Sequence, residues 1–100
     1  MRTVLFFAFC FFAVPVVGQD VDSLAAAAQV DSLIKISRDL TGQGDFDKAL
    51  EVNAAAEKIA LEKFGRESAA YGNCCFNRGR IMERKGDKRE AERWYLESLQ

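Results

Sequence analysis

The stretch GDFDKAL, residues 44–50, reads as a turn that runs into a helix, and a similar stretch, GDKREAE, follows at residues 86–92. Glycine allows the backbone to leave a helix because it adopts conformations that other residues avoid. The two stretches therefore predict the same turn and helix start twice, 42 residues apart. A helix pair that recurs at a fixed period indicates a helical solenoid, in which each pair buries its apolar face against its neighbour.

The period extends beyond the turns. Residues from position 30 onward align with residues 72–100 at a shift of 42, and large residues fall on large ones and small residues on small ones. The aligned pairs are Gly44 with Gly86, Asp45 with Asp87, Ala49 with Ala91, Ala56 with Ser98, Ser37 with Gly79, Leu33 with Cys75, and Leu40 with Met82.

Apolar spacing predicts four helices, at about residues 22–41, 46–63, 67–85 and 88–100. The loops between them are short, so consecutive helices are expected to pack antiparallel. Small residues on the facing stripes allow close approach of the helices, and close packing also explains Gly79, although Gly72 has no such explanation. The expected core stripes are Leu33, Ile36, Ser37 and Leu40; Ala49, Val52, Ala56, Ile59 and Ala60; Tyr71, Cys75, Gly79 and Met82; and Ala91, Tyr95, Leu96 and Leu99.

The N-terminal segment MRTVLFFAFCFFAVPVVG, residues 1–18, has the pattern of a secretory signal peptide, with one basic residue, an apolar run and a small residue at the cut. The apolar run between Val4 and Val17 is shorter than the roughly 20 residues that span a bilayer, which argues against the alternative of an uncleaved anchor. A lipoprotein signal at Cys10 is weaker still, because a bulky phenylalanine precedes it. We expect cleavage after Gly18 and an exported protein, secreted or periplasmic, without a stable membrane span.

The mature chain, residues 19–100, keeps all 15 Asp and Glu and all but one of the 14 Lys and Arg, so its charge favours no class of partner. Its composition favours helix throughout, and its length allows one small domain with a thin core. The predicted architecture is all-α, a short α-solenoid of antiparallel helix pairs. It comprises a lead-in at residues 19–29, a first unit at 30–71 and an incomplete second unit at 72–100.

The residue types argue against most kinds of catalytic and metal-binding site. Histidine is absent, which removes the commonest general base and metal ligand. Cys74 and Cys75 are adjacent, so their Cα atoms lie about 3.8 Å apart, closer than disulfides prefer. We expect them to be buried thiols, with a redox or intermolecular role as the alternative. We therefore expect no enzyme active site, no metal and no cofactor. Two carboxylate pairs, Asp45 with Asp47 and Glu51 with Glu57, are expected at a turn and on a solvated helix face.

The two units resemble tetratricopeptide repeats. Gly44, Phe46 and Ala49 match that family's glycine, aromatic and alanine spacing. The usual period is about 34 residues, and the longer period here is similar to the kinesin-light-chain type. The segment EKFGRESAAYGNCCFNRGRI, residues 62–81, is similar to that type's junction between repeats. In the second unit, Gly79, Ala91, Tyr95 and Ser98 match the small, small, aromatic and small positions.

Three residues depart from the pattern. Asn53 stands where the first unit should have a large aromatic residue, and Lys88 replaces the aromatic residue of the second turn. Arg78 stands where the second unit should have leucine. We expect these departures to alter the packing of the first unit and to leave a looser seam or an exposed edge at Arg78.

The resemblance implies a protein–protein interaction scaffold whose concave groove holds a peptide or helix of a partner. Asn77 matches the asparagine that bonds peptide backbone in the family, and Arg80 or Arg84 could receive a carboxylate. The basic segment RGRIMERKGDKR, residues 78–89, fits either a solvated helix end or an acidic partner, and without interleaved aromatics it does not favour nucleic acid. The implied groove residues are Asp31, Ile34, Lys35, Arg38, Asn73, Phe76, Asn77, Arg80 and Arg84.

Two alternatives remain open. The chain could be the non-catalytic N-terminal repeat region of a longer exported enzyme, such as a caspase-like CHAT protease. The last helix still carries apolar residues at Leu96 and Leu99, with no helix after it, so we expect a longer repeat protein. A free-standing helical bundle would require the 42-residue period to be accidental.

Replacing Ala49 or Ala91 by leucine tests the alignment of the two helix pairs. Each bulky side chain is expected to force the paired helices apart and to lower the free energy of unfolding by about 1–3 kcal/mol. Thermal melting followed by circular dichroism measures the loss. If neither variant melted at a lower temperature, the aligned helix pairs would be wrong.

Overall fold

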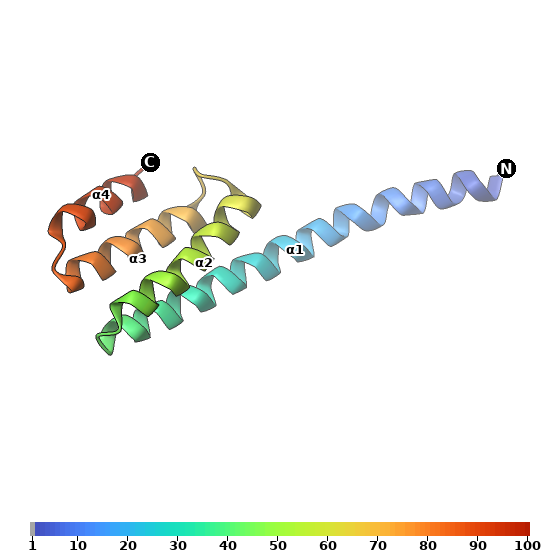
Figure 1. The fold of residues 1–100 in the computed structure, drawn as a ribbon. Coiled ribbons are helices and arrows are strands. Elements are labelled where there is room, and N and C mark those ends of the chain that lie inside the picture. The colour runs from blue at the N-terminus through green and yellow to red at the C-terminus, as the bar shows by residue number, and fades with distance from the viewer. Residues whose placement is uncertain (1) are drawn as a thin grey trace.

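The fold consists of four helices joined by short loops (Figure 1). They are α1 (Arg2–Gly42), α2 (Phe46–Phe64), α3 (Ala69–Lys85) and α4 (Lys88–Ser98). In this computed structural model the side chains are described for residues 21–100, and the predicted signal peptide at residues 1–18 lies outside that range. The prediction of an all-α fold is confirmed for the described part of the chain, where no strand occurs. Within the described residues, no helix is long and apolar enough to cross a membrane.

The helix boundaries differ from the predicted ones by small amounts at most ends. The expected lead-in at residues 19–29 is already helical within α1, and Ala26 is buried there. Helix α3 begins at Ala69, two residues later than expected, because Ser68 caps it. The Ser68 Oγ accepts a hydrogen bond from the Tyr71 N–H at 3.1 Å. Helix α4 ends at Ser98 instead of continuing to the last residue, Gln100.

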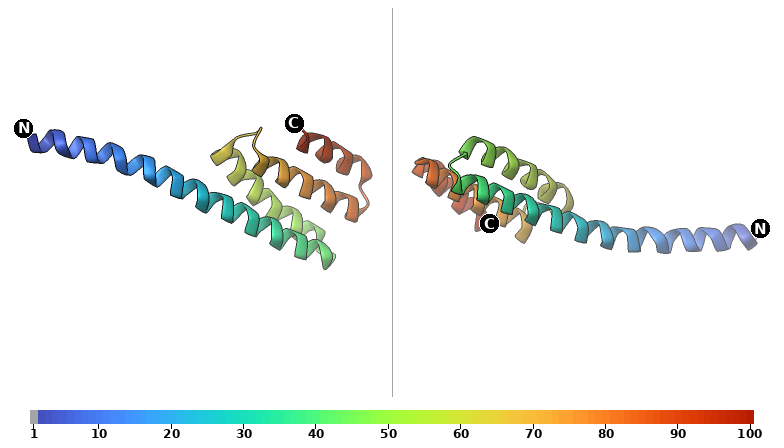
Figure 2. Two further views of the ribbon diagram at one scale, coloured as in Figure 1. Left: turned by 180° about the vertical axis from the view of Figure 1, so that it is seen from behind. Right: turned by 90° about the horizontal axis from the view of Figure 1, so that it is seen from below.

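Neighbouring helices run antiparallel, as the short loops predicted. The C-terminal half of α1 lies along α2, α2 packs against α3, and α3 packs against α4 (Figures 1 and 2). Helix α1 also contacts α3 directly. Because one antiparallel helix intervenes, α1 and α3 run in the same direction, which places equivalent faces of the two helices side by side.

The two predicted turns have matching backbone geometry. Gly44 has a φ of 84° and Gly86 a φ of 101°, both in the region that favours glycine. The next residue, Asp45, donates its N–H to the Leu40 carbonyl at 2.9 Å, and the Asp87 N–H bonds to the Met82 carbonyl at the same distance. These bonds are one period apart, so the repeated sequence produces a repeated structure.

The helix crossings that follow the turns also correspond. In the first unit, the Ser37 hydroxyl donates to the Ala49 carbonyl at 2.9 Å. In the second unit, a Cβ added to Gly79 would lie 3.1 Å from the Ala91 carbonyl oxygen and 2.7 Å from two Tyr95 ring carbons. The close packing predicted at Gly79 is therefore confirmed. Close packing also explains the glycine at position 72, since a Cβ added to Gly72 would lie 3.3 Å from the Ser98 carbonyl oxygen.

The core is thin and built from small side chains. Its centre consists of Val30, Ala56, Ala60 and Cys74, with Leu33, Ile34, Ile59, Ala70 and Tyr71 packed around them. Ala49 and Ala91 are also buried, which agrees with the prediction that small residues line the helix contacts.

Three residues of the expected core stripes are exposed. Ile36 is 47% exposed, because the buried face of α1 is centred on Val30 and Ser37 and Ile36 lies to one side of it. Leu96 and Leu99 are also exposed, since α4 packs against α3 alone among the described helices.

Gly79→Ala tests the tight contact between α3 and α4. In an open helix this change would stabilise by about 1 kcal/mol, but here the methyl group meets the Tyr95 ring and a backbone carbonyl. We expect a net loss of about 1–3 kcal/mol from overpacking, measured by urea denaturation. Gly42→Ala is the matched control, because nothing lies within 4 Å of its added Cβ. Equal stability of the two variants would contradict the contact.

Candidate functional site

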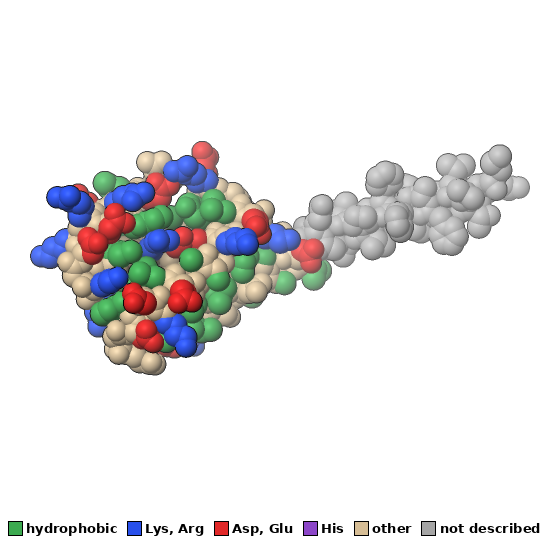
Figure 3. Space-filling model, viewed as in Figure 1, with side chains coloured by type: hydrophobic (Ala, Val, Ile, Leu, Met, Phe, Trp, Pro, Cys, Tyr) green, Lys and Arg blue, Asp and Glu red, His purple; other side chains and the backbone are tan. Residues whose placement is uncertain are grey.

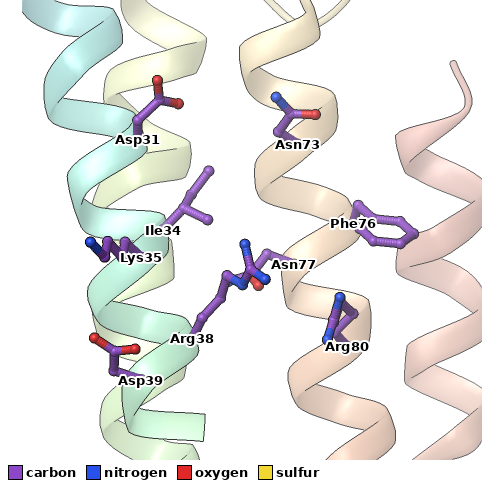
Figure 4. Close-up of a pocket in the computed structure, with 9 residues that line it drawn as sticks. All are labelled: Asp31, Ile34, Lys35, Arg38, Asp39, Asn73, Phe76, Asn77 and Arg80. Atoms are coloured by element: carbon purple, nitrogen blue, oxygen red, sulfur yellow. The ribbon is translucent and has the colours of Figure 1, made fainter. Parts of the chain in front are cut away.

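A hollow of about 620 Å³ lies on the face where α1 and α3 run side by side, and we call it the α1–α3 groove (Figure 4). The structure brings together all of the sequence-predicted groove residues except Arg84. Arg84 lines an adjoining hollow of about 240 Å³, which shares Arg38, Asp39, Asn77 and Arg80 with the groove. Asp39 was not among the predicted groove residues, although its position four residues after Lys35 puts it on the same helix face. The groove is lined by Asp31, Ile34, Lys35, Arg38, Asp39, Asn73, Phe76, Asn77 and Arg80.

The lining side chains take different directions. Ile34 and Arg38 point from α1 toward α3, whereas Lys35 and Asp39 point away from it (Figure 4). On the other wall, Phe76 turns toward α4, where its ring centroid lies 5.2 Å from that of Tyr95. Phe76 is still 49% exposed, so an apolar surface borders the polar groove.

Asn77 is buried at the floor of the groove, and its side chain is held firmly. Its amide nitrogen donates to the Ser37 hydroxyl at 3.2 Å and to the Asn53 side-chain oxygen at 2.9 Å. Both N–H groups are therefore used inside the protein. The side-chain oxygen of Asn77 has no hydrogen bond within residues 21–100, so this acceptor is free at the groove.

A buried polar network continues from Asn77. The amide nitrogen of Asn53 donates to the Glu57 carboxylate at 2.7 Å and to the Cys74 carbonyl at 3.0 Å. The other Glu57 oxygen accepts from an Arg78 Nη1 at 2.9 Å. We call these five residues the polar network: Ser37, Asn53, Glu57, Asn77 and Arg78.

The network corrects two sequence-based predictions. Glu57 was expected on a solvated helix face, but it is only 8% exposed and pairs with Arg78. Arg78 was expected to leave a looser seam or an exposed edge. Instead it is half-buried, and its guanidinium lies 4.4 Å from the ring centroid of Trp94 on α4. A cation stacked on an aromatic face fills the place of the expected leucine.

Two buried polar atoms at this seam have no hydrogen-bond partner among the described residues. They are Arg78 Nε and Trp94 Nε1. The Trp94 ring is also approached by Arg93, whose guanidinium carbon lies 5.6 Å from the ring centroid. The sequence does not predict the contact with Arg78, because the two residues are 16 positions apart and meet only when α3 packs on α4.

Burial raises the pKa of Glu57 above its usual value, and the nearby Arg78 charge and the hydrogen bonds from Asn53 and Arg78 oppose this rise. The folded protein therefore holds the Glu57 proton to a higher pH than the unfolded chain does. Consequently, the contribution of Glu57 to the free energy of unfolding falls as the pH rises through the raised pKa.

The two thiols are unsuited to nucleophilic chemistry. Cys74 and Cys75 are free and fully buried, as expected. Burial raises the pKa of Cys74 to about 12, and it also raises the pKa of Cys75. Both are protonated near neutral pH, whereas the thiolate is the reactive form. Within residues 21–100, no group of three potential metal ligands comes together.

The basic segment 78–89 is divided among several roles. Arg78 pairs with Glu57, and Lys85 approaches Asp47 at 3.5 Å. Arg80 and Arg84 face the two hollows. Charged side chains of both signs are interspersed with apolar ones over the visible face of the helical body (Figure 3). The segment is therefore divided between ion pairs and the lining of the two hollows.

Arg78→Leu tests the buried ion pair. Without the guanidinium, Glu57 is left buried beside fewer donors, and we expect the free energy of unfolding to fall by about 1–3 kcal/mol near pH 7. Since the pKa of Glu57 rises further in this variant, the loss should be smaller near pH 4, where the carboxyl is more protonated. Urea denaturation at both pH values measures the difference.

Two further variants control this experiment. Adding Glu57→Gln to Arg78→Leu removes the buried charge and should abolish the extra loss at neutral pH. Arg66→Leu removes another arginine–glutamate pair, Arg66 with Glu97, but on the exposed surface, where little change is expected. An Arg78→Leu variant as stable as Arg66→Leu at both pH values would show that the buried pair contributes nothing.

Comparison with known protein families agrees with this arrangement of helix pairs and groove. A family model described as tetratricopeptide repeat matches residues 25–100, which is most of the chain. No curated protein and no solved structure matches the chain. Tetratricopeptide repeats generally mediate protein–protein interactions. With two turns of matching geometry, close crossings between small residues and this family match, the chain belongs to the tetratricopeptide repeat family.

Proposed function

We propose that this protein is a non-catalytic interaction module that binds an extended peptide or a helix of a partner protein in the α1–α3 groove. One observation carries the proposal. Side chains from two parallel helices line a single open hollow, and those of Asp31, Arg38, Asn73 and Arg80 have no hydrogen bond or ion pair among residues 21–100. Unpaired polar groups around a concave surface are what a peptide ligand requires.

The rigidity of the groove floor supports this proposal. Asn77 is fixed by two hydrogen bonds inside the protein, and its remaining acceptor lies where a peptide N–H could reach it. A side chain that is already positioned loses little conformational entropy when a ligand binds, which improves affinity. The buried polar network thus supports the binding surface from below.

The arginines of the groove favour an acidic group on the partner. Arg38 and Arg80 both line the groove, and Arg84 lines the adjoining hollow. Arginine can bind a carboxylate through two parallel hydrogen bonds, which makes such contacts strong and directional. We therefore propose that at least one carboxylate of the partner binds at the end of the groove where Arg38 and Arg80 lie.

Two features of the sequence extend the proposal. The matching turns at Gly44 and Gly86 support a repeat of the 42-residue, kinesin-light-chain-like type. The signal-peptide pattern of residues 1–18 supports export, so the partner would be met outside the cytoplasm.

Arg80→Glu tests the proposed binding surface. Peptides selected by the chain from a phage-displayed library of random dodecapeptides should bind this variant at least about tenfold more weakly, because a favourable contact becomes repulsive. Arg89→Glu is the matched control, since Arg89 is exposed on α4 and does not line the groove. Equal binding by both variants, measured by fluorescence anisotropy, would exclude the groove as the binding surface.

A further inference from the structure

The charged side chains that line the groove include both signs, and their directions separate them. Asp31 and Asn73 lie at one end, and Arg38 and Arg80 lie at the other (Figure 4). The remaining charged lining residues, Lys35 and Asp39, point away from α3 in the same view. Apart from these two side chains, the groove therefore presents one carboxylate, that of Asp31, at one end and two arginines at the other.

The spacing between the two ends is the same on both walls. Asp31 precedes Arg38 by seven residues on α1, and Asn73 precedes Arg80 by seven residues on α3. Because a helix rises 1.5 Å per residue, each wall places its two ends about 10 Å apart. An extended peptide advances about 3.3 Å per residue, so the ends are about three peptide residues apart.

An apolar side chain occupies the middle. Ile34 points into the groove from α1 between the two ends, and it is half-buried rather than fully covered. A peptide lying across it would meet an acidic group, then an apolar contact, then two arginines. Asn77 stands on the opposite wall with its free acceptor and could bond the peptide backbone in the same region.

We infer that the groove recognises an extended partner segment with ordered charge: a basic residue at Asp31, an acidic residue about three positions away at Arg38 and Arg80, and an apolar residue between them. This inference rests on the proposed function and specifies the ligand of the same surface. It differs from recognition of a uniformly acidic segment, because a second carboxylate would be repelled at Asp31.

Library selection tests the charge order directly. Random dodecapeptides displayed on phage are selected on the wild-type chain and on Asp31→Lys, and the enriched sequences are compared. The wild-type chain should enrich peptides with a basic and an acidic residue about three positions apart around an apolar one. Asp31→Lys should reduce binding of those peptides at least about tenfold and should favour an acidic residue at the formerly basic position.

Two further variants sharpen the test. Asp22→Lys makes the same change on an exposed part of α1 outside the groove and should leave the selected pattern unchanged. The double variant Asp31→Lys with Arg80→Glu should select the same two charges in the reversed places.

The outcomes separate this inference from the proposed function. Enriched peptides that are acidic throughout, lose binding to Arg80→Glu and ignore Asp31→Lys would overturn the charge order while leaving the groove as the binding surface. Peptides that bind all of these variants equally would overturn the groove itself. A pattern that changes equally with Asp22→Lys and Asp31→Lys would also overturn the inference, since the effect would be one of overall charge.

Discussion

The buried polar network is the interaction on which the rest of this structure depends. It begins at Ser37 on α1, passes through Asn77 on α3 and Asn53 on α2, and ends at the Glu57–Arg78 ion pair. The stack of Arg78 on Trp94 extends it to α4. Hydrogen bonds are directional, and a buried group left without its partner is costly. The network therefore specifies one register for helices whose small apolar contacts would tolerate others.

The same network explains how a thin core can support a binding surface. Alanine, cysteine and valine dominate the fully buried positions, and such side chains allow close helix approach but bury little apolar area each. The polar contacts supply the specificity that large apolar side chains would otherwise give. Because Asn77 belongs both to the network and to the groove, the position of a proposed ligand contact is coupled to the packing of three helices.

Local patterns in the sequence were sufficient to predict the helices, their turns and most of the groove. Glycine and helical periodicity act over a few residues, so Gly44, Gly86 and Gly79 could be interpreted without a structure. Residues such as Asp31 and Arg38, two helical turns apart, share a face for the same reason. The polar network could not be predicted, because Glu57 and Arg78 become partners only when α2 and α3 lie in a particular register. Likewise, the exposure of Ile36 depends on which side of α1 its neighbours cover.

The stack of Arg78 on Trp94 gives the molecule an intrinsic optical probe. Trp94 is the single tryptophan of the chain, so its fluorescence emission arises from one place, the seam between α3 and α4. The far-ultraviolet signal, in contrast, sums over every helix. A local detachment of α4 would therefore change the emission before the helical signal falls, whereas cooperative unfolding would change both together. The fluorescence of Trp94 therefore reports on the contact between α3 and α4 at which Arg78 replaces the leucine expected for the repeat.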